Sequence, residues 1–131
     1  MSPWFAGPDD PEPALRTGLT ACADMWGRHR AVLRAISENW LAVPELRDRW
    51  TKFMNNFVDD VVAEIDRQRA IGLAPPGADS RTIATTLTWA GERMSYVTGV
   101  NMYGDNHERD MVDGLLSIWL GAIYQQAPSS I

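Results

Sequence analysis

The chain has 131 residues, of which 45% are hydrophobic and 22% charged, as expected of one globular domain. Twelve basic and seventeen acidic side chains leave a net charge of -5, and the basic ones are scattered, which argues against direct nucleic-acid binding. No apolar run reaches the ~20 residues that cross a bilayer, no secretion signal opens the chain and Cys22 has no cysteine to pair with, so we expect a cytoplasmic protein without membrane contact.

Two helices are predicted in the first part of the chain, after a proline-rich linker over residues 1–12. The first covers residues 13–28 and the second covers residues 30–41. Apolar residues recur on both at spacings of three and four, which is the repeat of one helical face. The expected inner faces consist of Leu15, Leu19, Cys22, Trp26, Val32, Leu33, Ile36 and Trp40.

The longest helix is predicted from Pro44 to about Ala70, because proline suits the first turn of a helix. Glycines and prolines within residues 72–77 end it. Its expected inner face consists of Leu46, Trp50, Phe53, Met54, Phe57, Val61 and Ile65.

Two further helices complete a domain over residues 13–127, followed by a short tail over residues 128–131. Asp79 or Ser80 is expected to cap the fourth helix, and Asp105 or Asn106 the fifth. The inner side of the fourth helix is expected to consist of Ile83, Leu87, Ala90, Met94 and Val97. Strict alternation of polar and apolar residues is absent, so the predicted fold class is all-α with five helices.

The last helix contains the run LLSIWLGAIY, residues 115–124, which is apolar on every side. A helix that is apolar all round must be buried all round. We favour the explanation that the last two helices pair with those of a second copy across a two-fold axis. The alternative is that this helix is central and wrapped by the others. The first explanation predicts a dimer interface that includes Trp89, Leu116, Leu120 and Ile123.

Residues that could carry catalysis or hold a metal do not form a recognisable motif. His29 and His107 lie on different elements without ligand partners at suitable spacing, so no metal and no cofactor are expected. The pair Glu92–Arg93 interrupts the most apolar part of the fourth helix. It is either a surface pair or a buried polar group that orients a ligand. The sequence therefore favours a protein that is not an enzyme.

Three segments, RWTKFMNNFVDDVVAEIDRQRAIGLAP, ATTLTWAGERMSYVTG and LLSIWLGAIY, resemble the C-terminal ligand-binding and dimerisation domain of TetR-type transcriptional repressors. The resemblance covers about residues 14–126. It implies a homodimer whose last two helices form a four-helix bundle, and an apolar tunnel for a small hydrophobic ligand. In that family a separate N-terminal helix-turn-helix domain binds the operator, and no segment here resembles it, so no direct contact with nucleic acid is expected of this chain.

The resemblance also implies which residues line the tunnel. They are Leu15, Leu19, Cys22, Trp26, Trp50, Met54, Phe57, Val61, Thr88, Gly91, Glu92, Tyr96 and Trp119. Thr88 and Gly91 stand where the most similar family member has asparagines, and Asp60 stands where it has a tyrosine, so a ligand of different shape and polarity is expected. Periodicity alone favours a filled core, and the family resemblance reverses that preference. Two other functions remain open: an enzyme that uses Glu92 or Asp60 as acid or base, and a structural dimerisation module.

Overall fold

The computed structural model describes residues 10–105 and 107–129, and within these ranges it contains five helices and no strand. The helices are α1 (Pro11–Arg28), α2 (Arg30–Asn39), α3 (Pro44–Ala70), α4 (Ser80–Gly99) and α5 (Glu108–Tyr124). The predicted all-α class is confirmed. Residues 1–9 of the predicted linker, Asn106 and residues 130–131 of the predicted tail lie outside the described residues.

Capping residues explain where two of the helices begin. Asp10 accepts a hydrogen bond of 3.0 Å from the Glu12 N–H, with Pro11 in the first turn, so α1 begins two residues before the predicted boundary. Asp79 caps α4 as predicted, since its carboxylate accepts from the Thr82 N–H at 3.0 Å. The predicted cap of α5 is wrong for Asp105, because His107 occupies the N-cap position there and its side chain forms no capping bond.

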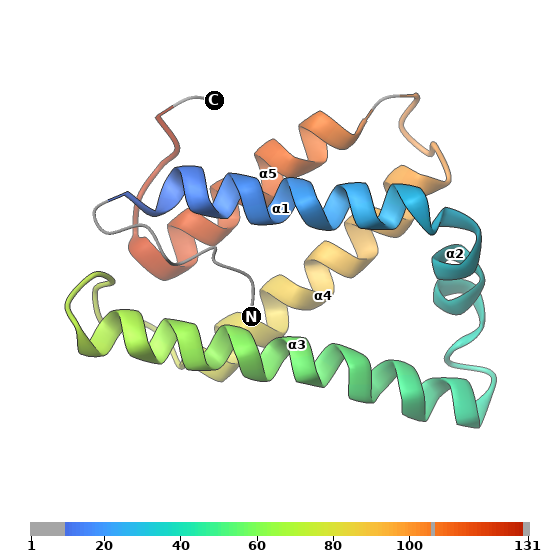
Figure 1. Cartoon of the computed structure of the whole chain (residues 1–131), viewed down its shortest axis with the longest axis horizontal. Helices are drawn as coiled ribbons and strands as arrows, with labels where there is room; N and C mark the ends of the chain where they lie inside the picture. Colours follow the sequence, from blue (N-terminus) through green and yellow to red (C-terminus); the bar gives the residue numbers. More distant parts are fainter. Residues whose placement is uncertain (1–9, 106, 130–131) are drawn as a thin grey trace.

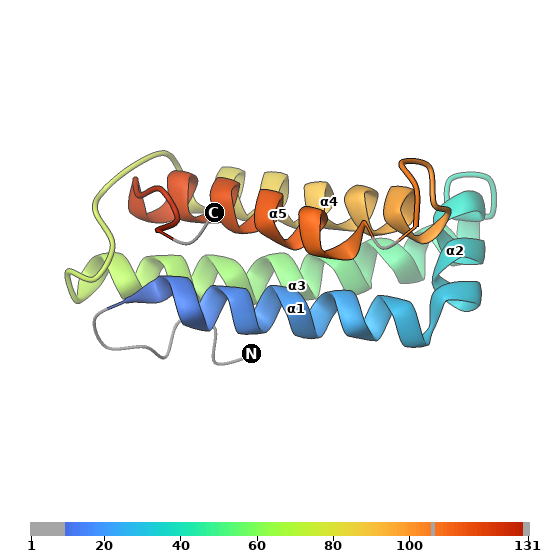
Figure 2. The same ribbon diagram turned by 90° about the horizontal axis from the view of Figure 1, so that it is seen from above.

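The helices form two layers. Figure 2 shows α1 and α3 in one layer and α4 and α5 in the other, with the short α2 across one end. Figure 1 shows α4 running diagonally between α1 and α3. Because α1 packs chiefly on α5 and α3 chiefly on α4, the two helices of the first layer are held by the second layer more than by each other. This arrangement leaves room between the layers.

The buried faces follow the predicted stripes with three corrections. Val32 and Phe53 were expected inside, but they are 63% and 52% exposed. On α4 the buried face is rotated from the predicted one, since Ala90, Met94 and Val97 are only partly buried. The buried face instead combines three apolar residues with four polar ones. The buried residues of α4 are Ile83, Ala84, Leu87, Thr88, Glu92, Ser95 and Thr98.

Most of the apolar helix α5 is covered within a single chain. Leu116, Leu120 and Ile123 are at most 1% exposed, because α1 and α4 both pack on α5. The expectation that these three side chains meet a second copy is therefore corrected, and the alternative of a wrapped helix describes them better. Trp89 is partly buried and stacks on Trp40 with ring centroids 5.4 Å apart.

A narrower face of α5 stays open to solvent. Ile118 is 46% exposed, and a Cβ built on either Gly114 or Gly121 would meet nothing within 4 Å. The exposed residues of this face are Gly114, Ser117, Ile118, Gly121 and Ala122. We call it the open face of α5.

Candidate ligand-binding site

A cavity lies between the two helix layers, and all five helices contribute side chains to it. It has roughly 100 Å³ of free space, and we call it the central cavity. Its walls are mostly apolar, which is the usual character of a small-molecule site. The lining residues are Leu19, Cys22, Ala23, Met25, Trp26, Leu33, Trp50, Phe53, Met54, Phe57, Leu87, Thr88, Gly91, Glu92, Ser95, Met111, Leu115 and Trp119.

Aromatic side chains of α1 and α3 form one wall of the central cavity. Trp50 stacks on Phe53 with ring centroids 5.2 Å apart, and Trp26 meets Trp50 edge-on at 6.4 Å. The spacing of Trp50, Phe53, Met54 and Phe57 along α3 brings them to one side of that helix. Because Phe53 lines the cavity and is also half exposed, it lies where the cavity meets solvent.

Glu92 places a carboxylate on the opposite wall, on the buried face of α4. Its side chain is 3% exposed, whereas that of Arg93 is 50% exposed. The Ser37 hydroxyl donates to Glu92 Oε1 at 3.2 Å, and Arg93 Nη2 donates to the same oxygen at 3.4 Å. The arginine also lies over the Tyr96 ring, 4.8 Å from its centroid. Of the two readings of the Glu92–Arg93 pair, the structure therefore supports a buried polar group at Glu92 beside a solvent-exposed arginine.

Among the residues that the structure describes, two further polar atoms of the cavity lining are buried without a hydrogen-bond partner. They are Thr88 Oγ1 and Trp50 Nε1. Buried polar groups normally form hydrogen bonds, so these two atoms are unsatisfied polar groups of residues in the cavity wall. The Cys22 thiol is partly buried there as well, and burial raises its pKa, which keeps it protonated and neutral.

The structure brings together most of the residues that the sequence placed around the tunnel. Those that line the central cavity are Leu19, Cys22, Trp26, Trp50, Met54, Phe57, Thr88, Gly91, Glu92 and Trp119. Leu15 and Val61 do not line it, because both are 0% exposed and belong to the packed core. Asp60, one of the two candidate acid-base residues, is exposed on α3 and does not line the cavity either.

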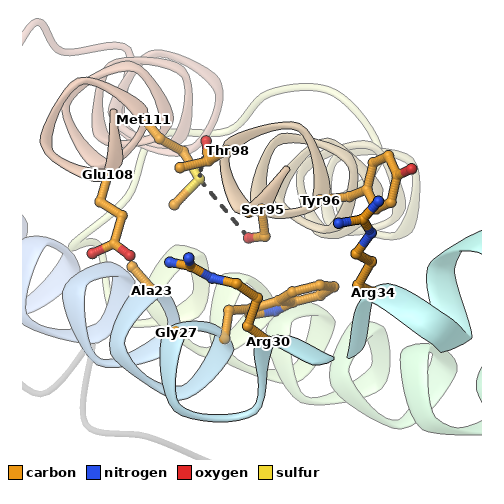
Figure 3. A pocket seen from close by; sticks show the side chains of 11 residues that line it. Ala23, Gly27, Arg30, Arg34, Ser95, Tyr96, Thr98, Glu108 and Met111 are labelled. Carbon is orange, nitrogen blue, oxygen red and sulfur yellow. Dashed lines mark hydrogen bonds between the residues drawn. The ribbon is translucent and has the colours of Figure 1, made fainter. Parts of the chain in front are cut away.

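Tyr96 lies elsewhere than predicted. Its hydroxyl donates to Glu38 Oε2 at 2.7 Å, which raises the pKa of the tyrosine and lowers the pKa of the carboxyl. Tyr96 lines a second, smaller pocket, into which Arg30 projects from α2 and Glu108 from α5 (Figure 3). With about 20 Å³ of free space, this pocket holds little more than one water molecule.

Several lining residues were not predicted, namely Ala23, Met25, Leu33, Phe53, Leu87, Ser95, Met111 and Leu115. A signal for two of them exists in the sequence. Met111 and Leu115 precede Trp119 by eight and four residues, so one face of α5 carries all three. Whether the others line the cavity depends on how deeply neighbouring helices pack. The spacing of residues along one helix does not determine this.

Within residues 10–105 and 107–129, no group of three or more His, Cys, Asp or Glu side chains is placed to hold a metal ion. The same ranges contain no helix with both the length and the apolar character that a membrane crossing requires.

Comparison with known proteins places the chain in a family of regulators. Residues 15–125 match the C-terminal domain of the transcriptional regulator EthR. The HTH-type transcriptional regulator EthR of Mycobacterium tuberculosis (strain ATCC 25618 / H37Rv) is 30% identical over 115 residues, which cover 88% of this chain and 53% of that protein. The protein of the same name from Mycolicibacterium smegmatis is 29% identical over 121 residues, covering 92% of this chain and 56% of the relative. The chain thus spans about half the length of the curated relatives it matches.

The match fits the five-helix architecture and extends over nearly all the described residues. The relatives are named as transcriptional regulators. This chain belongs to the family defined by the C-terminal domain of the transcriptional regulator EthR, within the TetR-like regulators.

Proposed function

We propose that this domain is the effector sensor of a TetR-like regulator, and that it binds a small hydrophobic molecule in the central cavity. The observation that carries the proposal is a space between helix layers whose apolar walls contain a few polar atoms with unused hydrogen-bonding capacity. A closely packed core leaves little free space between its side chains, so a space of this size between the layers is available to a ligand.

The size of the cavity sets a condition on the ligand. Its free space of roughly 100 Å³ is below the ~300–1,000 Å³ that is usual for small-molecule sites. Cavities of about 150 Å³ are known to bind benzene, so even a molecule of that size requires the walls of the roughly 100 Å³ central cavity to adjust slightly. A larger ligand requires the aromatic wall to move, and Phe53 is the side chain with solvent to move into.

We further propose that two copies pair through the open face of α5. This face combines the partly exposed Ile118 with glycines at 114 and 121 that have open space around them, which lets two helices approach closely. A ligand that fits one spacing of the two subunits better than another would shift the population toward it. In a regulator with paired DNA-binding domains, that spacing determines whether both reach their half-sites.

Native mass spectrometry of the purified protein tests both parts of the proposal. A dimer that releases a small hydrophobic molecule on denaturation supports the sensor function. Screening with small aromatic compounds then follows the tryptophan fluorescence and the melting temperature. If no compound raises the melting temperature and none perturbs Trp50, the domain is a structural dimerisation module.

Introducing a charge into the open face of α5 by substitution tests the proposed dimer interface. Ile118→Glu should raise the dimer dissociation constant by about 100-fold or more, because an unpaired charge buried in an interface costs several kcal/mol. Ile71→Glu is the matched control, since Ile71 is 55% exposed and is the C-cap residue of α3, outside the open face of α5. A dimer that survives Ile118→Glu unchanged would place the interface on another surface.

A further inference from the structure

The central cavity carries a net negative charge. Among the described residues that line it, Glu92 is the only one with a charged side chain, and no lysine, arginine or histidine faces it from any helix. Cys22, the other lining residue that can ionise to an anion, has a raised pKa because it is buried. A ligand that enters this cavity therefore meets one carboxylate and no cation.

The charge of Glu92 is only partly compensated by its neighbours. Both hydrogen bonds that it accepts go to Oε1, from Ser37 at 3.2 Å and from Arg93 at 3.4 Å. Within the described part of the chain, Oε2 accepts no hydrogen bond. The Arg93 guanidinium is half exposed and shared with the Tyr96 ring, so it is a weak counter-ion. A buried carboxylate is costly unless it is paired and hydrogen-bonded, and this one has room for another donor.

The rest of the wall suits a positive charge as well. Aromatic rings have electron-rich faces that attract cations, and rings arranged around a site are a common means of binding ammonium groups. Five aromatic residues line the central cavity, namely Trp26, Trp50, Phe53, Phe57 and Trp119. They line the same cavity as Glu92.

We infer that the central cavity selects ligands that combine an apolar body with an ammonium group, the ammonium lying against Glu92 and the apolar body among the aromatic rings. This inference rests on the proposed ligand-binding function and adds a chemical class to it. Carboxylic acids and phosphates are disfavoured, because they would bring a second negative charge beside Glu92, whose cationic neighbour Arg93 is half exposed and does not line the cavity. Neutral alcohols can donate a hydrogen bond to Oε2, but they lack the attraction between opposite charges.

Three probes of nearly the same size and shape separate charge from shape. Benzylammonium, benzyl alcohol and benzoate differ in the charge of one substituent, and each carries a single benzene ring. Titration into the ¹⁵N-labelled protein at pH 7 follows the indole N–H signals of the tryptophans, of which Trp50 reports on the cavity wall. We expect benzylammonium to bind about tenfold more tightly than benzyl alcohol, and benzoate to bind more weakly than either.

Glu92→Gln removes the charge with little change in size, and the preference for benzylammonium over benzyl alcohol should disappear. Glu45→Gln makes the same change at an exposed position in the first turn of α3, and it should leave the preference intact. If the melting temperature shows that Glu92→Gln does not fold, the comparison of the three probes on the unaltered protein still tests the inference. Equal affinities for benzylammonium and benzyl alcohol would overturn the inference while leaving the sensor function standing. Absence of any shift of the Trp50 indole signal with all three probes would instead reject ligand binding in the cavity.

Discussion

Filling the central cavity from Gly91 should stabilise the protein and remove its capacity to bind ligands. A Cβ built on Gly91 meets nothing within 4 Å, and the residue lines the cavity, so Gly91→Leu directs a side chain into free space. Cavity volume costs about 24 cal/mol per Å³. The roughly 100 Å³ of free space is therefore worth at most about 2 kcal/mol. Replacing a glycine inside a helix adds about 1 kcal/mol, so we expect a gain of about 1–3 kcal/mol.

Urea denaturation followed by far-UV circular dichroism measures this gain, and the melting temperature should rise by about 3–5 °C for each kcal/mol. Gly91→Ala is the matched control, because it provides the gain in helix propensity without filling the cavity. Gly91→Leu should also abolish the indole shifts produced by benzyl alcohol, while Gly91→Ala keeps them. A Gly91→Leu protein less stable than the unaltered one would refute the reasoning, since it would mean that the space is already occupied.

Three further outcomes follow from the packing and the hydrogen bonds. Leu120→Ala should lower the free energy of unfolding by about 2–5 kcal/mol in urea denaturation, because Leu120 is 0% exposed between α1 and α4. The Cys22 thiol should react slowly with iodoacetamide, with a rate that rises through a pH above the ordinary ~8.5, because burial raises its pKa; a midpoint below 8.5 would contradict its burial. Tyr96→Phe should raise the pKa of the Glu38 carboxyl, measured by ¹³C NMR titration, since the hydrogen bond from that tyrosine is the largest cause of its lowering. The lowered pKa of Glu38 stabilises the folded state above the pKa of the unfolded chain, and this contribution should be lost as the pH falls through the folded pKa.

The position of Glu92 shows how packing turns an ambiguous sequence feature into a specific one. In the sequence, Glu92 and Arg93 are adjacent residues on an apolar helix, and either one could face the interior. The rotation of α4 between α3 and α5 buries the glutamate and exposes the arginine. The carboxylate is thereby placed in the wall of the central cavity, where it can determine which ligands bind.

Residue spacing, capping residues and shared motifs were enough to predict the helices and the family from the sequence. Spacings of three and four, Pro44 and Asp79 predicted elements that agree with the structure to within a few residues, because helix formation depends on local periodicity and capping. The same information could not distinguish Val61, which is packed in the core, from Met54, which lines the cavity on the same helix. Both lie on one helical stripe.

Which residues of those apolar stripes pack in the core, and which face the cavity or solvent, depended on the tertiary structure. Free space lies between the layers, where α1 packs chiefly on α5 and α3 packs chiefly on α4. The spacing of residues along one helix does not specify how far apart two helices pack. The same limit explains why the sequence did not show what covers each side of α5. Its apolar circumference predicted complete burial, but whether neighbours within the chain or a second copy would cover each side depended on the packing of α1 and α4. Those helices cover Leu116, Leu120 and Ile123 and leave the face around Ile118 open.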